Sequence, residues 1–308
     1  MKTLLKLAVA GAALFGLVSC DQESEDTRTF SFAMAAYNLI TSVDDDDVAF
    51  VAPVVYSFAT KYPDNTITVA SSSMSLPDGG SATFTTVPVQ MSIKNVSVDD
   101  RNVEHITFSS SDPTQSGAKI TDFNGILTQG AYAPGSVEVP GYPREYPSKL
   151  VAHFPILDYT LNESWRVRTF WSDMTFAGTT TTTYPGMTGP YTNGKIRYRV
   201  VMKTGTANSL TGKADVIFYN AKFAASEKAP EITVALKDLD LKFTKQGYTL
   251  AGTDVVPFMM EGGELVPAPS YVFNNFTFNV VGNLTQCTAS YKVANVFDGQ
   301  FQGVSIAQ

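Results

Sequence analysis

The sequence predicts an all-β fold made of two tandem, related antiparallel β modules, each barrel-like or sandwich-like, after a signal peptide and an acidic tether. Three observations carry this prediction. The chain has 20 Phe and 14 Tyr and is rich in Val and Thr, and these side chains suit a pleated, half-buried surface. Apolar and polar residues alternate with a period of two in several runs, and turn-forming pairs separate the runs. After residue 20, no segment shows a sustained helical period.

The clearest alternation lies in residues 196–203, where the even positions are apolar and most odd positions are basic. We therefore expect Arg197, Arg199 and Lys203 to form a basic stripe on a solvent-facing strand surface. Residues 239–243 and 276–280 alternate in the same way. Residues 29–42 are compatible with either a strand or a short helix. Turn signals stand at Pro77-Asp78-Gly79-Gly80, Asn193-Gly194, Gly262-Gly263 and Gly282-Asn283.

Two segments at a fixed offset suggest that the β module is duplicated. Residues 67–76 mirror residues 232–241, and further short pairs follow in the same order. In both copies the apolar positions change phase, as between Val234 and Leu239. A shift of one residue turns a strand's apolar side chains to the other face, so each copy is predicted to contain a bulge or tight bend. The further pairs are 87–91 with 256–260, 106–108 with 276–278, and 123–125 with 297–299.

A segment dense in Gly, Pro and Tyr, residues 130–148, is predicted to link the modules, because proline cannot donate to a strand ladder. The predicted division is a signal peptide at 1–19, a lipidated Cys and acidic tether at 20–28, module 1 at 29–129, the linker at 130–148 and module 2 at 149–308.

The N-terminus carries the most specific motif. Lys2 and Lys6 form a basic region, and the apolar run at 7–18 is too short to span a bilayer but has the length of a signal-peptide core. The run ends in a bacterial lipobox, so acylation is expected on the thiol of its cysteine, with cleavage just before it. An acidic stretch, residues 21–26, then forms a solvated tether or an export signal. The lipobox is Leu17, Val18, Ser19 and Cys20.

Charge excludes one class of partner. The net charge is −7, and loss of Lys2 and Lys6 with the signal peptide leaves 20 basic residues (22 − 2) against 29 acidic residues, or −9. An acidic chain gains little from counterion release on a nucleic acid, so no nucleic-acid partner is expected.

Residues with catalytic or metal-binding chemistry are sparse. The two histidines, His105 and His153, have no partner at metal-ligand spacing. The run at 44–47 consists of four aspartates, which either supply oxygen ligands to Ca²⁺ or form a solvated turn, and the missing loop pattern favours the turn. Cys287 is expected to be a small buried apolar residue. We expect no enzymatic activity, no metal and no cofactor.

Aromatic residues offer the better binding candidates. Trp165 and Trp171 would share an apolar strand face, which favours burial over exposed stacking on sugars. Loop tyrosines among Gly and Pro are more suited to recognition, because loops carry binding residues more often than strands do. These speculative ligand-binding residues are Tyr132, Tyr142, Tyr146, Tyr184 and Tyr191.

The lipobox, the acidic tether and the repeated strand motifs together resemble β-rich Bacteroidota surface lipoproteins of the calycin-like or uncharacterised kind. The resemblance implies up-and-down β-barrels or sandwiches, anchoring in the outer membrane through the lipid, an outward-facing location and no established activity.

Two function classes follow from these observations. The first is a ligand-binding module for a glycan, a peptide or a small apolar molecule, which predicts an aromatic-lined pocket. The alternative is a structural or adhesive envelope protein, which predicts filled barrels without a pocket and allows an exposed edge strand that pairs with a partner. The expected partners are the membrane, through the lipid, and a glycan or protein at the cell surface.

Overall fold

In the computed structural model the chain is nearly all β, which confirms the predicted fold class. The described residues form twenty strands and two short 3₁₀-helices, and residues 29–42 are a strand. The structure describes residues 29–42, 49–61, 66–71, 89–98, 104–109, 118–120, 124–129, 138–142, 149–158, 163–226, 229–282 and 284–306.

The first sheet is an eight-stranded antiparallel barrel in up-and-down order. Each strand of the ring pairs with its neighbours along the chain, and β9 closes the ring by pairing with both β8 and β1. The ring strands are β1 (Thr29–Ser42), β2 (Ala49–Lys61), β3 (Thr66–Ser71), β4 (Val89–Val98), β5 (Glu104–Ser109), β7 (Asn124–Gln129), β8 (Lys149–Asp158) and β9 (Glu163–Phe170), with β6 (Ala118–Ile120) added beside β8.

The second sheet repeats this topology. Its first and last strands, β10 and β20, pair and close another ring of eight antiparallel strands. The ring strands are β10 (Asp173–Thr183), β12 (Arg197–Thr204), β13 (Leu210–Ala221), β14 (Ile232–Thr244), β15 (Gly247–Gly252), β18 (Phe273–Val281), β19 (Gln286–Val293) and β20 (Phe297–Ser305). The additions are β11 (Tyr191–Asn193) on β10, the hairpin β16 (Phe258–Glu261) and β17 (Glu264–Pro267) on β14, and the 3₁₀-helices η1 (Thr206–Asn208) and η2 (Pro269–Tyr271).

The boundary between the two β modules lies later in the chain than the predicted linker at 130–148. β8 and β9 complete the first ring, so the change from one ring to the other falls between Phe170 and Asp173 and not at 130–148. The Pro and Gly content of 130–148 marks a break between strands. It carries no information on which ring the next strands join, because that depends on the long-range pairing of β9 with β1.

The predicted bulge is present in the second barrel. Opposite β13, Val216 pairs with Leu236 and Ala214 pairs with Leu239, so β14 carries one extra residue at this point. Asp238 occupies the bulge with φ 61°, a conformation that Asp adopts more readily than most residues. The corresponding position after β3 lies outside the described residues.

The matched repeat segments do not occupy equivalent strands. Ile67 lies on the third strand of the first ring and Ile232 on the fourth strand of the second. Likewise, 124–125 lie on the sixth strand of the first ring, whereas 297–299 lie on the eighth strand of the second. Such short patterns suit any half-buried strand, so local sequence similarity does not fix the position in a ring.

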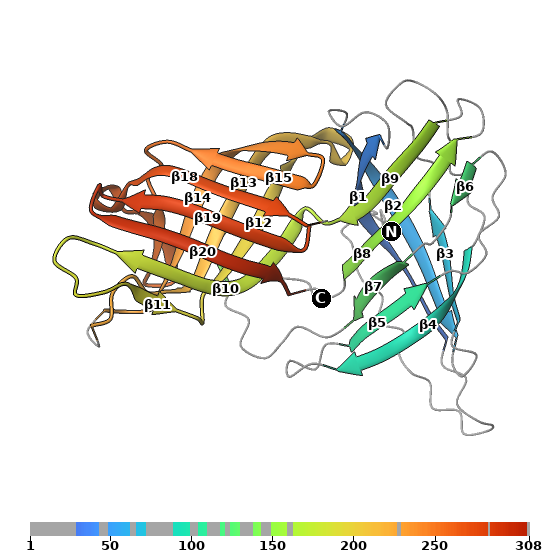
Figure 1. The fold of residues 1–308 in the computed structure, drawn as a ribbon, viewed down its shortest axis with the longest axis horizontal. Helices are drawn as coiled ribbons and strands as arrows, with labels where there is room; N and C mark the ends of the chain where they lie inside the picture. The colour runs from blue at the N-terminus through green and yellow to red at the C-terminus, as the bar shows by residue number, and fades with distance from the viewer. Residues whose placement is uncertain are drawn as a thin grey trace, which may run out of the picture.

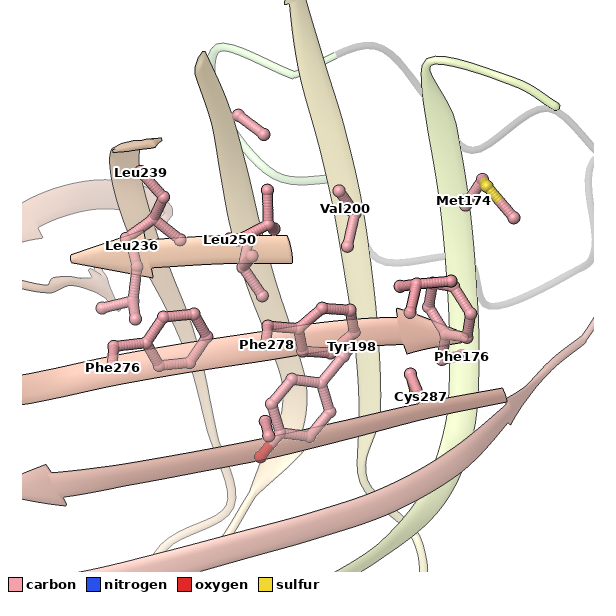
Figure 2. Close-up of a cluster of buried hydrophobic side chains, with 14 of the residues drawn as sticks. Met174, Phe176, Tyr198, Val200, Leu236, Leu239, Leu250, Phe276, Phe278 and Cys287 are labelled. Atoms are coloured by element: carbon pink, nitrogen blue, oxygen red, sulfur yellow. The ribbon is translucent and has the colours of Figure 1, made fainter. Parts of the chain in front are cut away.

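Aromatic side chains fill the second barrel. The even residues of β12 point inward as predicted, and Tyr198 is fully buried among Phe218, Phe278 and Phe301, with ring centroids 3.9 to 6.0 Å away. Figure 2 shows side chains from β10, β12, β14, β15, β18 and β19 meeting in this core. Core filling of this density makes the barrel a rigid body.

The first barrel packs against one end of the second. Tyr37, Leu39 and Phe170 belong to the same buried cluster as the second barrel's core. The Tyr37 hydroxyl donates to the Asn208 carbonyl at 2.8 Å, and Phe170 lies 5.5 Å from Phe243 between ring centroids. We call this end of the second barrel the proximal end. The opposite end, the distal rim, carries the connections 184–196, 222–231, 253–272 and 294–296 (Figure 1).

Candidate functional site

The interior of the second barrel is occupied by its own side chains. Besides the packed rings, buried hydroxyls satisfy one another there: Tyr198 lies 3.2 Å from the Tyr291 hydroxyl and 3.2 Å from the Thr180 hydroxyl. Burial raises the pKa of Tyr198 well above its ordinary value, so this network stays protonated. These side chains hold the barrel together and leave its surface for binding.

The distal rim is the candidate site, because the proximal end is covered by Tyr37, Leu39 and Phe170. In Figure 1 the rim lies at the left, where the turn between β19 and β20 and the long connection after β10 project away from the first barrel. Loops at the end of a rigid barrel commonly carry recognition residues.

Exposed and half-buried apolar residues stand on three neighbouring connections of this rim. The Ala294 amide donates to the Val272 carbonyl at 2.8 Å and so joins η2 to the β19–β20 turn. Beyond the turn, the Tyr184 ring meets the Phe297 ring edge-on at 5.2 Å, and the Tyr184 amide lies 3.2 Å from the Met187 sulfur. We call Tyr271, Val296, Phe297, Tyr184 and Met187 the rim strip.

Polar groups adjoin the rim strip on one side. The Asn274 side chain donates to the Asp254 carboxylate at 2.6 Å and accepts from the Asn295 backbone amide at 3.0 Å. Asp254 and Asn295 are exposed and both have positive φ, which Asp and Asn tolerate. The strip is therefore bordered by fixed amide and carboxylate groups.

The predicted tyrosines separate into three groups. Tyr184 and Tyr191 lie on the distal rim, both half-buried, and Tyr191 pairs with Thr182 at the start of β11. Tyr142 lies elsewhere, against the outer wall of the barrel with Val139. Tyr132 and Tyr146 lie outside the described residues. The structure thus brings two of the five to the rim, and Tyr271, which the sequence analysis did not select, joins them.

Tyr142 belongs to a polar network on the outer wall. Its hydroxyl donates to the Asp215 carboxylate at 2.8 Å. Burial is the main cause that raises the pKa of Tyr142, and the hydrogen bond to Asp215 raises it further. Asp215 also accepts from the Asp238 backbone amide at 2.8 Å and lies 3.2 Å from the Lys203 ammonium. The β14 bulge and residues 138–142 are thereby tied to the same carboxylate.

The basic stripe predicted to face solvent does so only in part: Arg197 and Lys203 are half-exposed, but Arg199 is buried. Arg199 is only 1% exposed and makes two hydrogen bonds to Asp173, from Nε at 2.8 Å and from Nη2 at 2.5 Å. The bonds from Asp173 outweigh the opposite effect of burial and raise the pKa of Arg199. Lys203 is paired with Asp215 and Asp238, and Arg197 lies over the Tyr219 ring at 5.4 Å. The alternation of β12 predicts that its odd residues are exposed on the outside of the barrel. Residues 138–142 cover this part of the outer wall, and a single-strand pattern cannot show that.

The remaining predicted residues offer no chemistry. Cys287 is free and buried as expected, and burial raises the pKa of its thiol. Trp171 packs against the core, in line with the prediction of burial. The side chains of Trp165, His105 and His153 are not described, and residues 44–47 and the lipobox with Cys20 lie outside the described range. Within the described part of the chain, no group of three or more His, Cys, Asp or Glu is arranged to hold a metal.

Comparison with known proteins gives no relative: no protein-family model, no curated protein and no solved structure matches the chain. Among the described residues, no helix has the length and apolar character needed to cross a membrane.

Proposed function

We propose that the chain is a lipoprotein anchored in the outer membrane through Cys20, facing outward, and that it recognises a partner through the distal rim. The sequence supports the anchor through the lipobox and the acidic tether that follows it. The observation that carries the recognition role is the apolar rim strip at the end of the second barrel opposite the first barrel.

The filled interior supports binding on the rim over binding inside the barrel. A small apolar ligand inside the second barrel would have to displace side chains such as Tyr198 and Phe278, which are fully buried and in ring contact. Binding on the rim needs no such displacement. A filled barrel is also the feature expected of an adhesive envelope protein, so the proposal joins the two function classes in a surface module that acts by contact.

A competing role as a strand-pairing adhesin has weaker support. Both rings are closed, so their strands offer no long open edge. At the end of the second sheet, β17 is four residues long and includes Pro267, which lacks a backbone donor, and Glu264. Short, charged, proline-containing edges resist pairing with another chain.

The anchor is tested by feeding expressing cells an alkyne-labelled palmitate. We expect label on the wild-type chain and none on a Cys20→Ala variant. Equal labelling of both would refute the anchor.

The rim is tested with the chain from residue 20 onward, which contains every described residue, on combined glycan and peptide arrays. Binding should fall in a Tyr271→Ala/Tyr184→Ala variant. It should be unchanged in Val304→Thr, a side chain as exposed as Tyr271 (51%) that lies near the proximal end of β20. Binding that survives the rim variant would place the site elsewhere.

A further inference from the structure

Taking the proposed rim as its starting point, we infer that the partner is a protein and that the rim strip binds an extended peptide segment with apolar side chains next to a basic residue. The sequence analysis left glycan and protein partners open. The exposed side chains of the distal region favour the protein.

Most of the large apolar side chains that are exposed in the distal region are aliphatic. The large apolar residues that are exposed in the distal connections and the adjoining hairpin are Val296 (42%), Tyr271 (51%), Val256 and Val266. Valine makes no hydrogen bonds, so a hydroxyl-rich sugar would lose its water contacts there without replacement. The apolar side chains of a peptide lose nothing of this kind and gain burial.

The strip is held rigidly. Val255 and Phe273 exchange both backbone hydrogen bonds at 3.0 and 2.9 Å, and the Val296 amide donates to the Val293 carbonyl at 2.9 Å. Because these loops are already ordered, binding costs less conformational entropy than it would for free loops. Exposed tyrosine with asparagine and glycine on fixed loops is also the composition that antibody loops use to bind proteins.

Charge next to the strip specifies the basic residue of the peptide. Asp254 is exposed and is joined through Asn274 to Asn295, the neighbour of Val296. On the preceding hairpin, Glu261 and Glu264 face each other across the β16–β17 turn, an arrangement that like charges disfavour. Beside the strip, the ammonium of Lys292 is paired with Asp298 at 3.6 Å. A lysine or arginine of the partner would lie against carboxylates and relieve their repulsion.

We expect the peptide to bind against the side chains of the rim strip and not to pair with β17 as an additional strand. Pro267 removes one backbone donor from the outer edge of β17, and only four residues of that edge are in strand conformation. Recognition therefore depends on the apolar side chains and on charge, and both can be changed without disturbing a strand ladder.

The probe is a panel of 12-residue peptides with three alternating Leu, Val or Phe residues and two Lys, tested against the chain from residue 20 onward by fluorescence anisotropy. Companion peptides replace the apolar residues with Ser or the lysines with Glu. We expect micromolar binding of the parent peptides, about tenfold weaker binding of the Glu series and loss of binding in the Ser series.

Matched variants locate the site. Tyr271→Ala and Val296→Thr should each weaken parent-peptide binding by about tenfold, while Val304→Thr, on an equally exposed surface, should not. Asp254→Asn keeps the turn and the Asn274 contact but removes the charge. We expect it to weaken binding of the lysine peptides by about threefold at low salt, and to leave the Glu series unaffected.

The outcomes separate this inference from the function on which it rests. Peptide binding that is indifferent to Tyr271→Ala and Val296→Thr overturns the inference. Glycan binding lost in Tyr271→Ala, with no peptide bound, overturns it and leaves the rim as a recognition site. Silence of a folded protein towards both arrays overturns the inference and the proposed rim together.

Discussion

Replacing Asp173 by Asn should destabilise the second barrel strongly, although Asp173 lies near the surface. Its carboxylate is the bidentate partner of Arg199, and the two side chains are 21% and 1% exposed. The substitution keeps the size of the side chain and one acceptor oxygen but removes the negative charge that faces both Nε and Nη2 of the buried guanidinium.

The magnitude follows from that burial. Removal of one partner from a buried ion pair costs about 3–5 kcal/mol, because the remaining charge is unpaired. The Tyr219 hydroxyl, 3.3 Å from Arg199 Nη1, is neutral and does not replace the carboxylate. At roughly 2–4 °C per kcal/mol for a protein of this size, the melting temperature should fall by about 10 °C.

Urea unfolding followed by circular dichroism measures the change. A matched control is Asp298→Asn, which breaks the exposed 3.6 Å pair with Lys292 and should cost less than about 0.5 kcal/mol. The double variant Asp173→Leu/Arg199→Met removes both charges and should recover most of the loss. A single variant within 0.5 kcal/mol of wild type, or a double variant no better than the single, would refute the reasoning.

Four further predictions concern the core of the second barrel and are measured by urea unfolding. Tyr248→Phe should be neutral or stabilising by up to about 1 kcal/mol, because this buried hydroxyl has no hydrogen-bond partner among the described residues; Tyr198→Phe should cost about 1–2 kcal/mol, because it leaves the Tyr291 hydroxyl with one partner fewer. Gly178→Ala should cost about 3 kcal/mol, because a Cβ there would overlap the Gln302 carbonyl oxygen on β20. Burial raises the pKa of Tyr291 from 10 to about 12, so between these pH values only the unfolded chain loses this proton, and Tyr291 alone should lower stability there by about 1.4 kcal/mol per pH unit. Tyr198 and Tyr248, whose pKa values burial also raises, should steepen the fall, so a Tyr291→Phe variant should reduce the slope by that amount. A stability that is flat from pH 10 to 12 would show that Tyr291 is not protected by folding.

Local periodicity was sufficient to predict the strands and one irregularity. The alternation from Ile196 to Met202 placed the even residues inside, where all four are buried. The phase change between Val234 and Leu239 predicted the bulge that centres on Asp238. Both features depend on a few neighbouring residues of one strand, so the sequence records them directly.

Contacts between distant segments could not be predicted in this way. Arg199 has the alternation of a solvent-facing residue, but Val139 and Tyr142, about 60 residues earlier, cover its wall. The pairing of β9 with β1, which decides where the first barrel ends, is equally non-local. No single-strand pattern contains this information, because it depends on which surfaces meet after the rings close.

The same distinction bears on the rim strip, of whose five residues only Tyr184 was predicted to bind a ligand. Closing a β ring requires regular alternation, and regular alternation leaves the interior full and the walls occupied. Side chains available to a partner then lie where alternation stops, at positions such as Asp254, Asn275, Ala294 and Asn295, which all have positive φ at the distal end. Pro and Gly marked the 184–191 loop in the sequence, whereas Val296 stands in a three-residue turn without such a signal; Tyr271 follows Pro267 and Pro269 and carried the same signal as Tyr184. Local rules for β structure therefore fail at the rim for the reason that makes it suited to recognition: its side chains are not committed to the barrel.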